Sequence, residues 1–128
     1  MSEAGTVNVF DLVGGEEFFT RLVDHFYAGV TGDPLLRPLY PSEDLAGANE
    51  RLRLFLMQYW GGPTTYSDTR GHPRLRMRHA PFPVGPDTQA AWLGHMSAAI
   101  EATGPPEPAR QMMLDYFTSA VEHLRNVR

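Results

Sequence analysis

The chain has 128 residues, of which 42% are hydrophobic and 20% charged, a composition typical of one globular domain. Its net charge of −4 argues against general nucleic-acid binding, and the absence of cysteine excludes disulfides, thiolate chemistry and covalent attachment of a cofactor through cysteine. The N-terminal MSEAGTVNVF lacks the pattern of a secretory signal, and no apolar run approaches the roughly 18 residues of a membrane span. We therefore expect a cytoplasmic protein with a single domain over residues 1–128, in which residues 1–9 form a flexible tail.

The first predicted helices flank a glycine pair. Gly14 and Gly15 indicate a sharp turn between a short helix and a longer one, and Glu16 and Glu17 then fall where the helix dipole favours anions. The sequence Gly32-Asp33-Pro34 is predicted to end the longer helix. Apolar residues of this helix recur at helical spacing: Phe18, Leu22, Phe26 and Val30, with Phe19, Val23 and Tyr27 widening the stripe.

A second amphipathic helix is predicted after the short segment at 35–41, which two prolines kink. Asp44 is its expected N-cap, and Gly61-Gly62-Pro63 is expected to end it. Its apolar residues are Leu45, Ala48, Leu52, Phe55, Leu56 and Tyr59. From Thr64 to Phe82 the chain is polar and basic, which favours a loop with one or two helical turns.

Two further helices complete the pattern. The third is predicted from about Asp87 to Ala102, and the fourth follows the break GPPEPARQ, where proline is tolerated in the first turn. The stripe of the third is Trp92, Met96, Ala99 and Ile100, and the inner face of the fourth is Met113, Tyr116 or Phe117, Ala120, Val121 and Leu124. No segment alternates with the period of a β-strand, so the predicted class is all-α with four main helices.

The histidines are the candidate metal ligands. His25 and His123 are expected at a helix edge or on the surface, and His72 in a capping or surface role. His95 is expected to be partly buried, and packing or solvation is a commoner fate for such a residue than metal ligation.

His79 differs because of its setting in LRMRHAPF. Proline disfavours helix in the residue before it, so the helical turn ends here and the imidazole lies near a chain reversal. Arg74, Arg76 and Arg78 suit an anionic group beside whatever His79 binds. From local context alone, an exposed basic loop is an equal alternative.

A lone histidine restricts the choice of metal. Zinc needs three or four protein ligands, and the sequence has no HExxH or similar spacing. Haem iron is different, because the porphyrin supplies four ligands and one histidine completes the site. Such a site also needs arginines for the propionates and aromatic and aliphatic walls for the macrocycle, and this chain has both.

Several stretches, in this order and spacing, resemble the truncated haemoglobins of group II, also called O-type. They are LVGGEEFF, HFY at 25–27, LYPSEDLAGANERLRLFLMQYWGGP, RGHPRLRMRHAPF and AAWL at 90–93. The resemblance extends from about Phe10 to Leu124. It implies a truncated globin fold, which is a two-over-two α-helical sandwich around haem.

The resemblance also implies a cofactor and the residues that serve it. The cofactor is non-covalent haem b (iron protoporphyrin IX), with His79 as proximal axial ligand of the iron. Tyr27, Tyr40 and Trp92 match distal residues that stabilise a bound ligand, and Ala48 stands where many globins have a distal histidine. Further haem contacts are expected at Phe26, Ala48, Arg51, Leu52, Phe55, Tyr66, Arg76, Met77, Arg78 and Phe82, with Arg51 as the first candidate for a propionate contact.

These assignments predict strong hydrogen bonding to O₂ and slow release, which suits redox chemistry on O₂, NO or peroxide, or ligand scavenging, better than bulk oxygen transport. NO, CO and anions such as sulfide are further expected ligands. An external reductase is expected because GxGxxG is absent. Whether the protein is an enzyme stays open between NO dioxygenation and a weaker peroxidase activity, as does homo-oligomer formation. The alternative is a haem-free α-helical interaction domain with a basic loop.

Overall fold

A computed structural model of the chain describes residues 8–40, 42–72 and 85–124, and these ranges contain helices but no β-strand. The α-helices are α1 (Val9–Val13), α2 (Glu16–Thr31), α3 (Leu45–Tyr59), α4 (Thr65–Arg70), α6 (Pro86–Thr103) and α7 (Ala109–His123). Two short 3-10 turns, η1 (Arg37–Leu39) and η2 (Ser42–Asp44), connect α2 to α3. The predicted all-α class is confirmed, and α2, α3, α6 and α7 are the four main helices that periodicity predicted.

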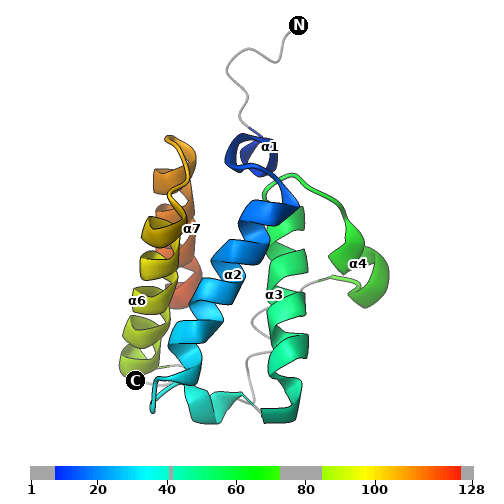
Figure 1. Cartoon of the computed structure of the whole chain (residues 1–128). Coiled ribbons are helices and arrows are strands. Elements are labelled where there is room, and N and C mark those ends of the chain that lie inside the picture. Colours follow the sequence, from blue (N-terminus) through cyan, green and yellow to red (C-terminus); the bar gives the residue numbers. More distant parts are fainter. Residues whose placement is uncertain (1–7, 41, 73–84, 125–128) are drawn as a thin grey trace, which may run out of the picture.

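The four long helices form two antiparallel pairs (Figure 1). Helix α3 runs back beside α2, α7 runs back beside α6, and α2 also packs against α6, which joins the pairs. This arrangement confirms the predicted two-over-two sandwich. None of the helices in the described ranges combines the length and apolar character that crossing a bilayer requires.

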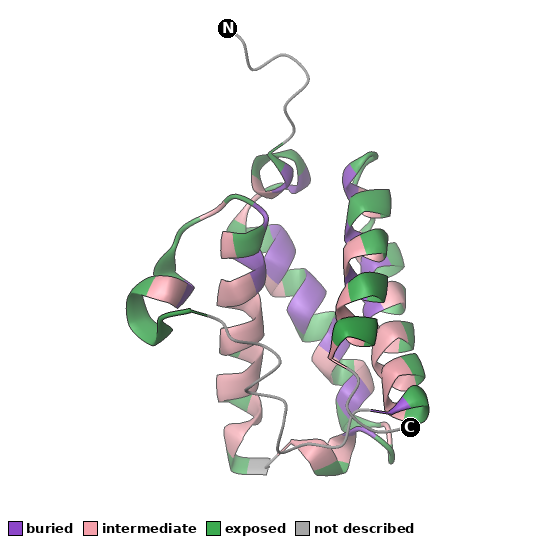
Figure 2. Ribbon diagram, turned by 180° about the vertical axis from the view of Figure 1, so that it is seen from behind, coloured by how far each residue is buried: buried purple, intermediate pink, exposed green. Residues whose placement is uncertain are grey.

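Helix α2 forms the centre of the core. It follows Gly14 and Gly15, whose φ angles of 110° and 72° lie where residues with a Cβ are strained. The stripe predicted for this helix is buried at Phe18, Phe19, Leu22, Val23, Phe26 and Val30 (Figure 2). The pair α6 and α7 adds Met96, Ala99, Ile100, Met113 and Phe117 to the same cluster.

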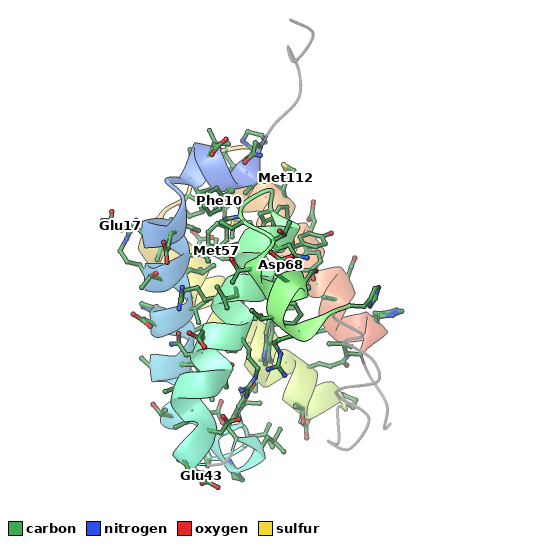
Figure 3. The ribbon with its side chains drawn as sticks, turned by 90° about the vertical axis from the view of Figure 1, so that its right-hand side faces the viewer. Phe10, Glu17, Glu43, Met57, Asp68 and Met112 are labelled. Atoms are coloured by element: carbon green, nitrogen blue, oxygen red, sulfur yellow. The ribbon has the colours of Figure 1, made fainter. Side chains whose placement is uncertain are left out.

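The N-terminal helix α1 is attached to the end of α3. The Asn8 side chain accepts a hydrogen bond from Asp11 N at 2.9 Å and donates one to Gly61 O at 3.3 Å. Phe10 N donates to Trp60 O at 2.9 Å, and the Phe10 ring lies near Met57 at this end of the molecule (Figure 3). The predicted tail therefore extends too far, because Asn8 caps α1 and the next residue is buried in the core.

The start of α3 agrees with prediction in position but not in interaction. Asp44 directly precedes the helix, yet its side chain makes no capping hydrogen bond. Its carboxylate is bound by Arg51 instead, with Nη2 and Oδ2 2.6 Å apart. A bidentate guanidinium partner is a stronger attraction for a carboxylate than a backbone N–H, so the ion pair replaces the cap.

Helix α6 matches its predicted span closely, and α7 begins within the predicted break. Gly104, with a φ of 61°, adopts the left-handed conformation that ends α6, and its N–H donates to Ile100 O at 3.0 Å. Pro108 stands immediately before α7 rather than inside its first turn. The resulting reversal places the inner face of α7 opposite α3 across a space that none of the described helices fills.

Candidate functional site

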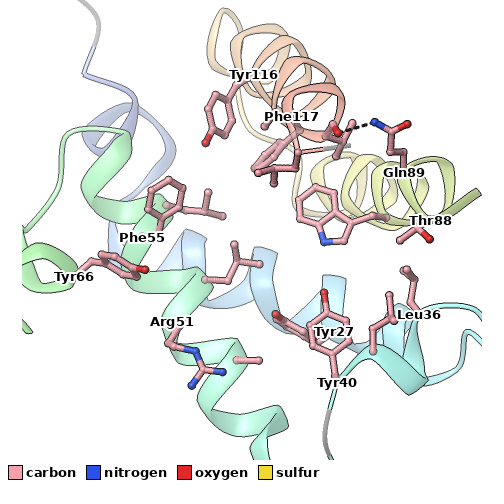
Figure 4. A pocket seen from close by; sticks show the side chains of 18 of the residues that line it. Tyr27, Leu36, Tyr40, Arg51, Phe55, Tyr66, Thr88, Gln89, Tyr116 and Phe117 are labelled. Carbon is pink, nitrogen blue, oxygen red and sulfur yellow. Dashed lines mark hydrogen bonds between the residues drawn. The ribbon is translucent and has the colours of Figure 1, made fainter. Parts of the chain in front are cut away.

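That space is a cavity of about 610 Å³ between α3 and the α6–α7 pair (Figure 4). The segment that follows α2 closes one end of it. Small-molecule and cofactor sites typically have volumes of about 300–1,000 Å³ and mainly apolar walls. Most of the side chains that line this cavity are aliphatic or aromatic, so its size and lining both fit such a site.

Most of the site residues predicted from sequence in the described ranges meet at this cavity. Those that line it are Tyr27, Tyr40, Ala48, Arg51, Leu52, Phe55, Tyr66 and Trp92. Phe26 does not line it, contrary to the predicted haem contact. Its ring is fully buried behind the wall, with centroids 5.0 Å from Tyr27 and 4.9 Å from Trp92. Phe26 therefore supports the two residues that face the cavity.

Three polar aromatic side chains from three different elements converge at one end of the cavity. Tyr27 comes from α2, Tyr40 follows η1, and Trp92 comes from α6. The rings of Tyr27 and Tyr40 meet edge to face with centroids 5.6 Å apart. We call Tyr27, Tyr40 and Trp92 the donor corner.

Hydrogen bonding links the three members of the donor corner. It lowers the pKa of Tyr40 through Trp92 and Tyr27, and it raises the pKa of Tyr27 through Tyr40. An indole N–H can only donate, whereas a phenol hydroxyl can donate and accept. The corner therefore offers donors to a small polar molecule in the cavity.

Burial keeps these phenols protonated. It is the largest cause of a raised pKa at both Tyr27 and Tyr40, because a phenolate loses hydration inside the protein. At Tyr27 the nearby Tyr40 raises the pKa further and the Arg51 charge lowers it less. Since an exposed tyrosine titrates near pH 10, both hydroxyls carry their protons at neutral pH.

Positive charge lies along another edge of the cavity. Arg51 lines it from α3 and is bound to Asp44, which also lines it, with their side chains 35% and 46% exposed. Arg70, at the end of α4, lines the cavity too, and its guanidinium lies 6.0 Å from the centroid of the Tyr66 ring. An anionic group at this edge would meet Arg70 and would share Arg51 with Asp44.

Sequence reasoning missed a large part of the wall. The lining residues that it did not assign to the site are Leu36, Leu39, Asp44, Leu56, Arg70, Thr88, Gln89, Tyr116, Phe117, Ala120, Val121 and Leu124. Those from α7 were assigned to the inner face of the fourth helix, so periodicity had placed them inward without indicating a cavity. Gln89 and Arg70 carry no such signal, because their role depends on where the ends of α6 and α4 meet the rest of the fold.

The predicted axial ligand and its neighbours cannot be placed. His79, Arg76, Met77, Arg78 and Phe82 lie outside the described residues. Within the described ranges, no group of three His, Cys, Asp or Glu side chains could hold a metal ion. None of the histidines in those ranges lines the cavity: His25, His72 and His123 are exposed as expected, and His95 is partly buried and bound to Asp33.

The chemistry of the lining fits a flat, apolar macrocycle that carries acidic groups. Facing walls of Leu52 and Phe55 on α3 and of Phe117 and Val121 on α7 offer apolar contact over both faces of such a group. The arginine edge suits carboxylates, and the donor corner suits a small polar ligand at a separate point.

Comparisons with known proteins agree with this geometry. The family model of the bacterial-like globins matches residues 8–126. The chain is 39% identical over 112 residues to group 2 truncated hemoglobin YjbI of Bacillus subtilis, which covers 88% of this chain and 84% of that protein. The hemoglobin of Chloroflexus aurantiacus superposes with a TM-score of 0.91 at 55% identity, covering 94% of this chain and 99% of that one. The truncated oxygen-avid haemoglobin of Bacillus subtilis gives a TM-score of 0.88 at 37% identity, covering 94% and 100%.

Proposed function

Because the chain belongs to the bacterial-like globins, as a group II truncated haemoglobin, we propose that it carries non-covalent haem b and restrains small ligands with the donor corner. Haem-based binding of ligands such as O₂ follows from the family itself. The type of haem, the strength of the distal hydrogen bonds and the reaction served are the proposed parts. The observation that carries them is the convergence of three donors, from three elements, on one end of an apolar cavity.

The residues that would hold the cofactor divide by chemistry. His79 is the proposed axial ligand, because the resemblance to the family assigns it that role and none of the histidines in the described ranges lines the cavity. Arg51 and Arg70 are the proposed partners of the propionates, with Arg76 and Arg78 as further candidates. Apolar contact is proposed for Leu52, Phe55, Tyr66, Phe117 and Val121, and also for Met77 and Phe82. When bound, haem would supply an iron that binds O₂, NO or CO.

The donor corner would act on the ligand through its O–H and N–H groups. Tyr27, Tyr40 and Trp92 all line the cavity, so each can offer a donor to a molecule at that end. A hydrogen bond to a charged acceptor contributes about 1.5–3 kcal/mol, which corresponds to roughly a 10- to 100-fold slower release. The name of the oxygen-avid relative from Bacillus subtilis supports slow O₂ release here.

Slow release suits chemistry or scavenging better than delivery. NO dioxygenation with electrons from an external reductase is the enzymatic form of this proposal, and sulfide is a further ligand that the three donors suit. Peroxidase activity is the weaker form, because Ala48 offers no acid–base group where many globins place histidine. The cysteine-free composition supports a cytoplasmic location. The haem-free interaction domain is not favoured, because the family match implies a haem site.

The first experiment is reconstitution with haemin and measurement of the absorption spectrum. The protein should give a Soret band, and His79→Ala should lose the axial-ligation spectrum of the unmodified protein while the fold, followed by circular dichroism, persists. A protein that stays colourless with haemin contradicts the proposal. Retention of the same ligation spectrum in His79→Ala would assign the axial position to another residue.

The second experiment measures O₂ dissociation from the ferrous protein. Tyr40→Phe should accelerate it about 10- to 100-fold, and Trp92→Phe should accelerate it too, because each variant removes a hydrogen-bond donor from the corner. Tyr66→Phe is the matched control, since it removes a phenol hydroxyl from the opposite side of the same cavity. Equal rates in Tyr40→Phe and Tyr66→Phe would remove Tyr40 from the mechanism.

A further inference from the structure

His95 and Asp33 form a half-buried, hydrogen-bonded pair outside the cavity. His95 Nε2 lies 2.7 Å from Asp33 Oδ2, and the two side chains are only 28% and 18% exposed. The residues are far apart in sequence, since His95 is in α6 and Asp33 follows α2. Such a pair fixes α6 relative to the end of α2 more strongly than an exposed pair would.

Asp33 also organises the turn that leads to Tyr40. Its Oδ1 accepts the N–H of Leu35 at 2.8 Å, and its carboxylate also accepts a backbone hydrogen bond from Leu36. Its backbone oxygen accepts the N–H of Arg37 at 2.8 Å. Arg37 in turn donates from Nη1 to Tyr40 O at 2.6 Å and accepts from Tyr40 N at 3.2 Å. A continuous set of hydrogen bonds therefore connects His95 with the backbone of Tyr40.

The imidazole of His95 packs directly on the backbone of α2. A Cβ added to Gly29 would clash with Nδ1 of the ring and would lie 3.1 Å from Cε1. Gly29 is two residues after Tyr27, and His95 is three residues after Trp92, nearly one turn along α6. The ring, which belongs to α6, thus packs on α2 and is hydrogen-bonded to Asp33 in the segment between α2 and η1.

We propose that His95 is a positioning residue that sets the relative placement of Tyr27, Tyr40 and Trp92. It does so through its pair with Asp33 and its contact with Gly29. The inference rests on the proposed ligand role of the donor corner and assigns its geometry to a contact outside the cavity. The hydrogen bond from His95 is the largest cause of a lowered pKa at Asp33, so this carboxylate remains an ionised acceptor at neutral pH.

The test uses carbon monoxide as the probe on the ferrous holoprotein. A hydrogen bond to the CO oxygen lowers the C–O stretching frequency, so the band reports how closely the donors approach. His95→Ala should move or split the band toward higher frequency and raise the O₂ dissociation rate about threefold to tenfold. His95→Gln, whose amide can still donate to Asp33, should restore most of the original band. Glu101→Gln is the matched control, because it breaks another ion pair of α6, with Arg110, without touching the donor corner.

A double-mutant cycle tests whether His95 and Asp33 act together. Asp33→Ala should reproduce the band shift of His95→Ala, and the double variant should add little to either. Gly29→Ala keeps His95 and Asp33 but displaces the His95 ring, so it should shift the C–O band in the same direction. This variant tests the proposal even if His95→Ala fails to fold.

The outcomes separate this inference from the proposed function. If Tyr40→Phe shifts the CO band but His95→Ala and Gly29→Ala change only the thermal unfolding temperature, the positioning role is overturned and the proposed function stands. If neither Tyr40→Phe nor His95→Ala shifts the band, both are overturned. Independent, additive shifts in the double-mutant cycle would also overturn the claim that the pair acts together.

Discussion

Helices α2 and α3 are nearly equal in length, 16 and 15 residues, yet their inward faces have different partners. On α2 six residues are buried in the core, whereas on α3 only two are. The rest of the inward face of α3, at Ala48, Leu52 and Phe55, lines the cavity. Periodicity predicts which face of a helix turns inward. It does not predict whether another helix or a ligand covers that face, and here the two cases stand side by side.

The largest effect should follow from a deletion on the packed side. Phe19 is fully buried, packs edge to face on Phe18 with ring centroids 5.2 Å apart, and does not line the cavity. Phe19→Ala should lower the free energy of unfolding by about 3–5 kcal/mol, because the cavity that it leaves cannot close fully. Urea denaturation measures the loss. The folded fraction should still bind haem, and a selective loss of haem binding would contradict the division into two sides.

A deletion on the cavity side should have a smaller effect on stability and a larger effect on haem retention. Leu52 is half-buried and lines the cavity. Leu52→Ala should cost the apoprotein about 1 kcal/mol in unfolding free energy, because little packed surface is lost. It should accelerate transfer of haem to an acceptor protein by up to about tenfold. If the apoprotein lost as much stability as Phe19→Ala, the face of α3 would be part of the packed core.

The smallest effect concerns a phenol at the boundary between the two sides. Burial, followed by the effect of Tyr59, raises the pKa of Tyr116 to about 12, while an unfolded tyrosine titrates near pH 10. Because the folded pKa is the higher one, this stabilisation is fully present below about pH 10 and is lost as the pH rises toward 12. The free energy of unfolding should fall over this window, and less steeply in Tyr116→Phe. If the free energy of unfolding, measured by urea denaturation, fell equally steeply with pH in both proteins, Tyr116 would not contribute to this pH dependence.

Local patterns were sufficient for the helices and insufficient for the long-range contacts made at their ends. The Gly14-Gly15 turn, the stripe of α2 and the limits of α6 are encoded by residues close together in the chain, and each was predicted. The role of Asn8 was not, because its partner Gly61 is 53 residues away. Asp44 was placed correctly but given the wrong partner, since the choice between a cap and an ion pair depends on where the Arg51 side chain points.

The site shows the same division. Resemblance identified Tyr27, Tyr40 and Trp92, which do converge, but local reasoning could not show that they lie within reach of one another. Arg70 and Gln89 were missed because the contacts that matter join distant segments: Gln89 donates to Val121 O at 2.6 Å, from the start of α6 to the end of α7. His79 stays a prediction, as it lies outside the described residues.

The attachment of α1 to the end of α3 has a consequence for synthesis on the ribosome. A helix of five residues is unstable in isolation, and its partners at Trp60 and Gly61 are translated much later. At about 5–20 residues per second, the 53 residues between Asn8 and Gly61 take roughly 3–11 seconds to add. Through that interval Asn8 and Phe10 lack their hydrogen-bond partners at the end of α3. Substitutions in the Gly61–Gly62 turn should therefore lower the yield of folded protein during synthesis more than they alter the cavity of the protein that does fold.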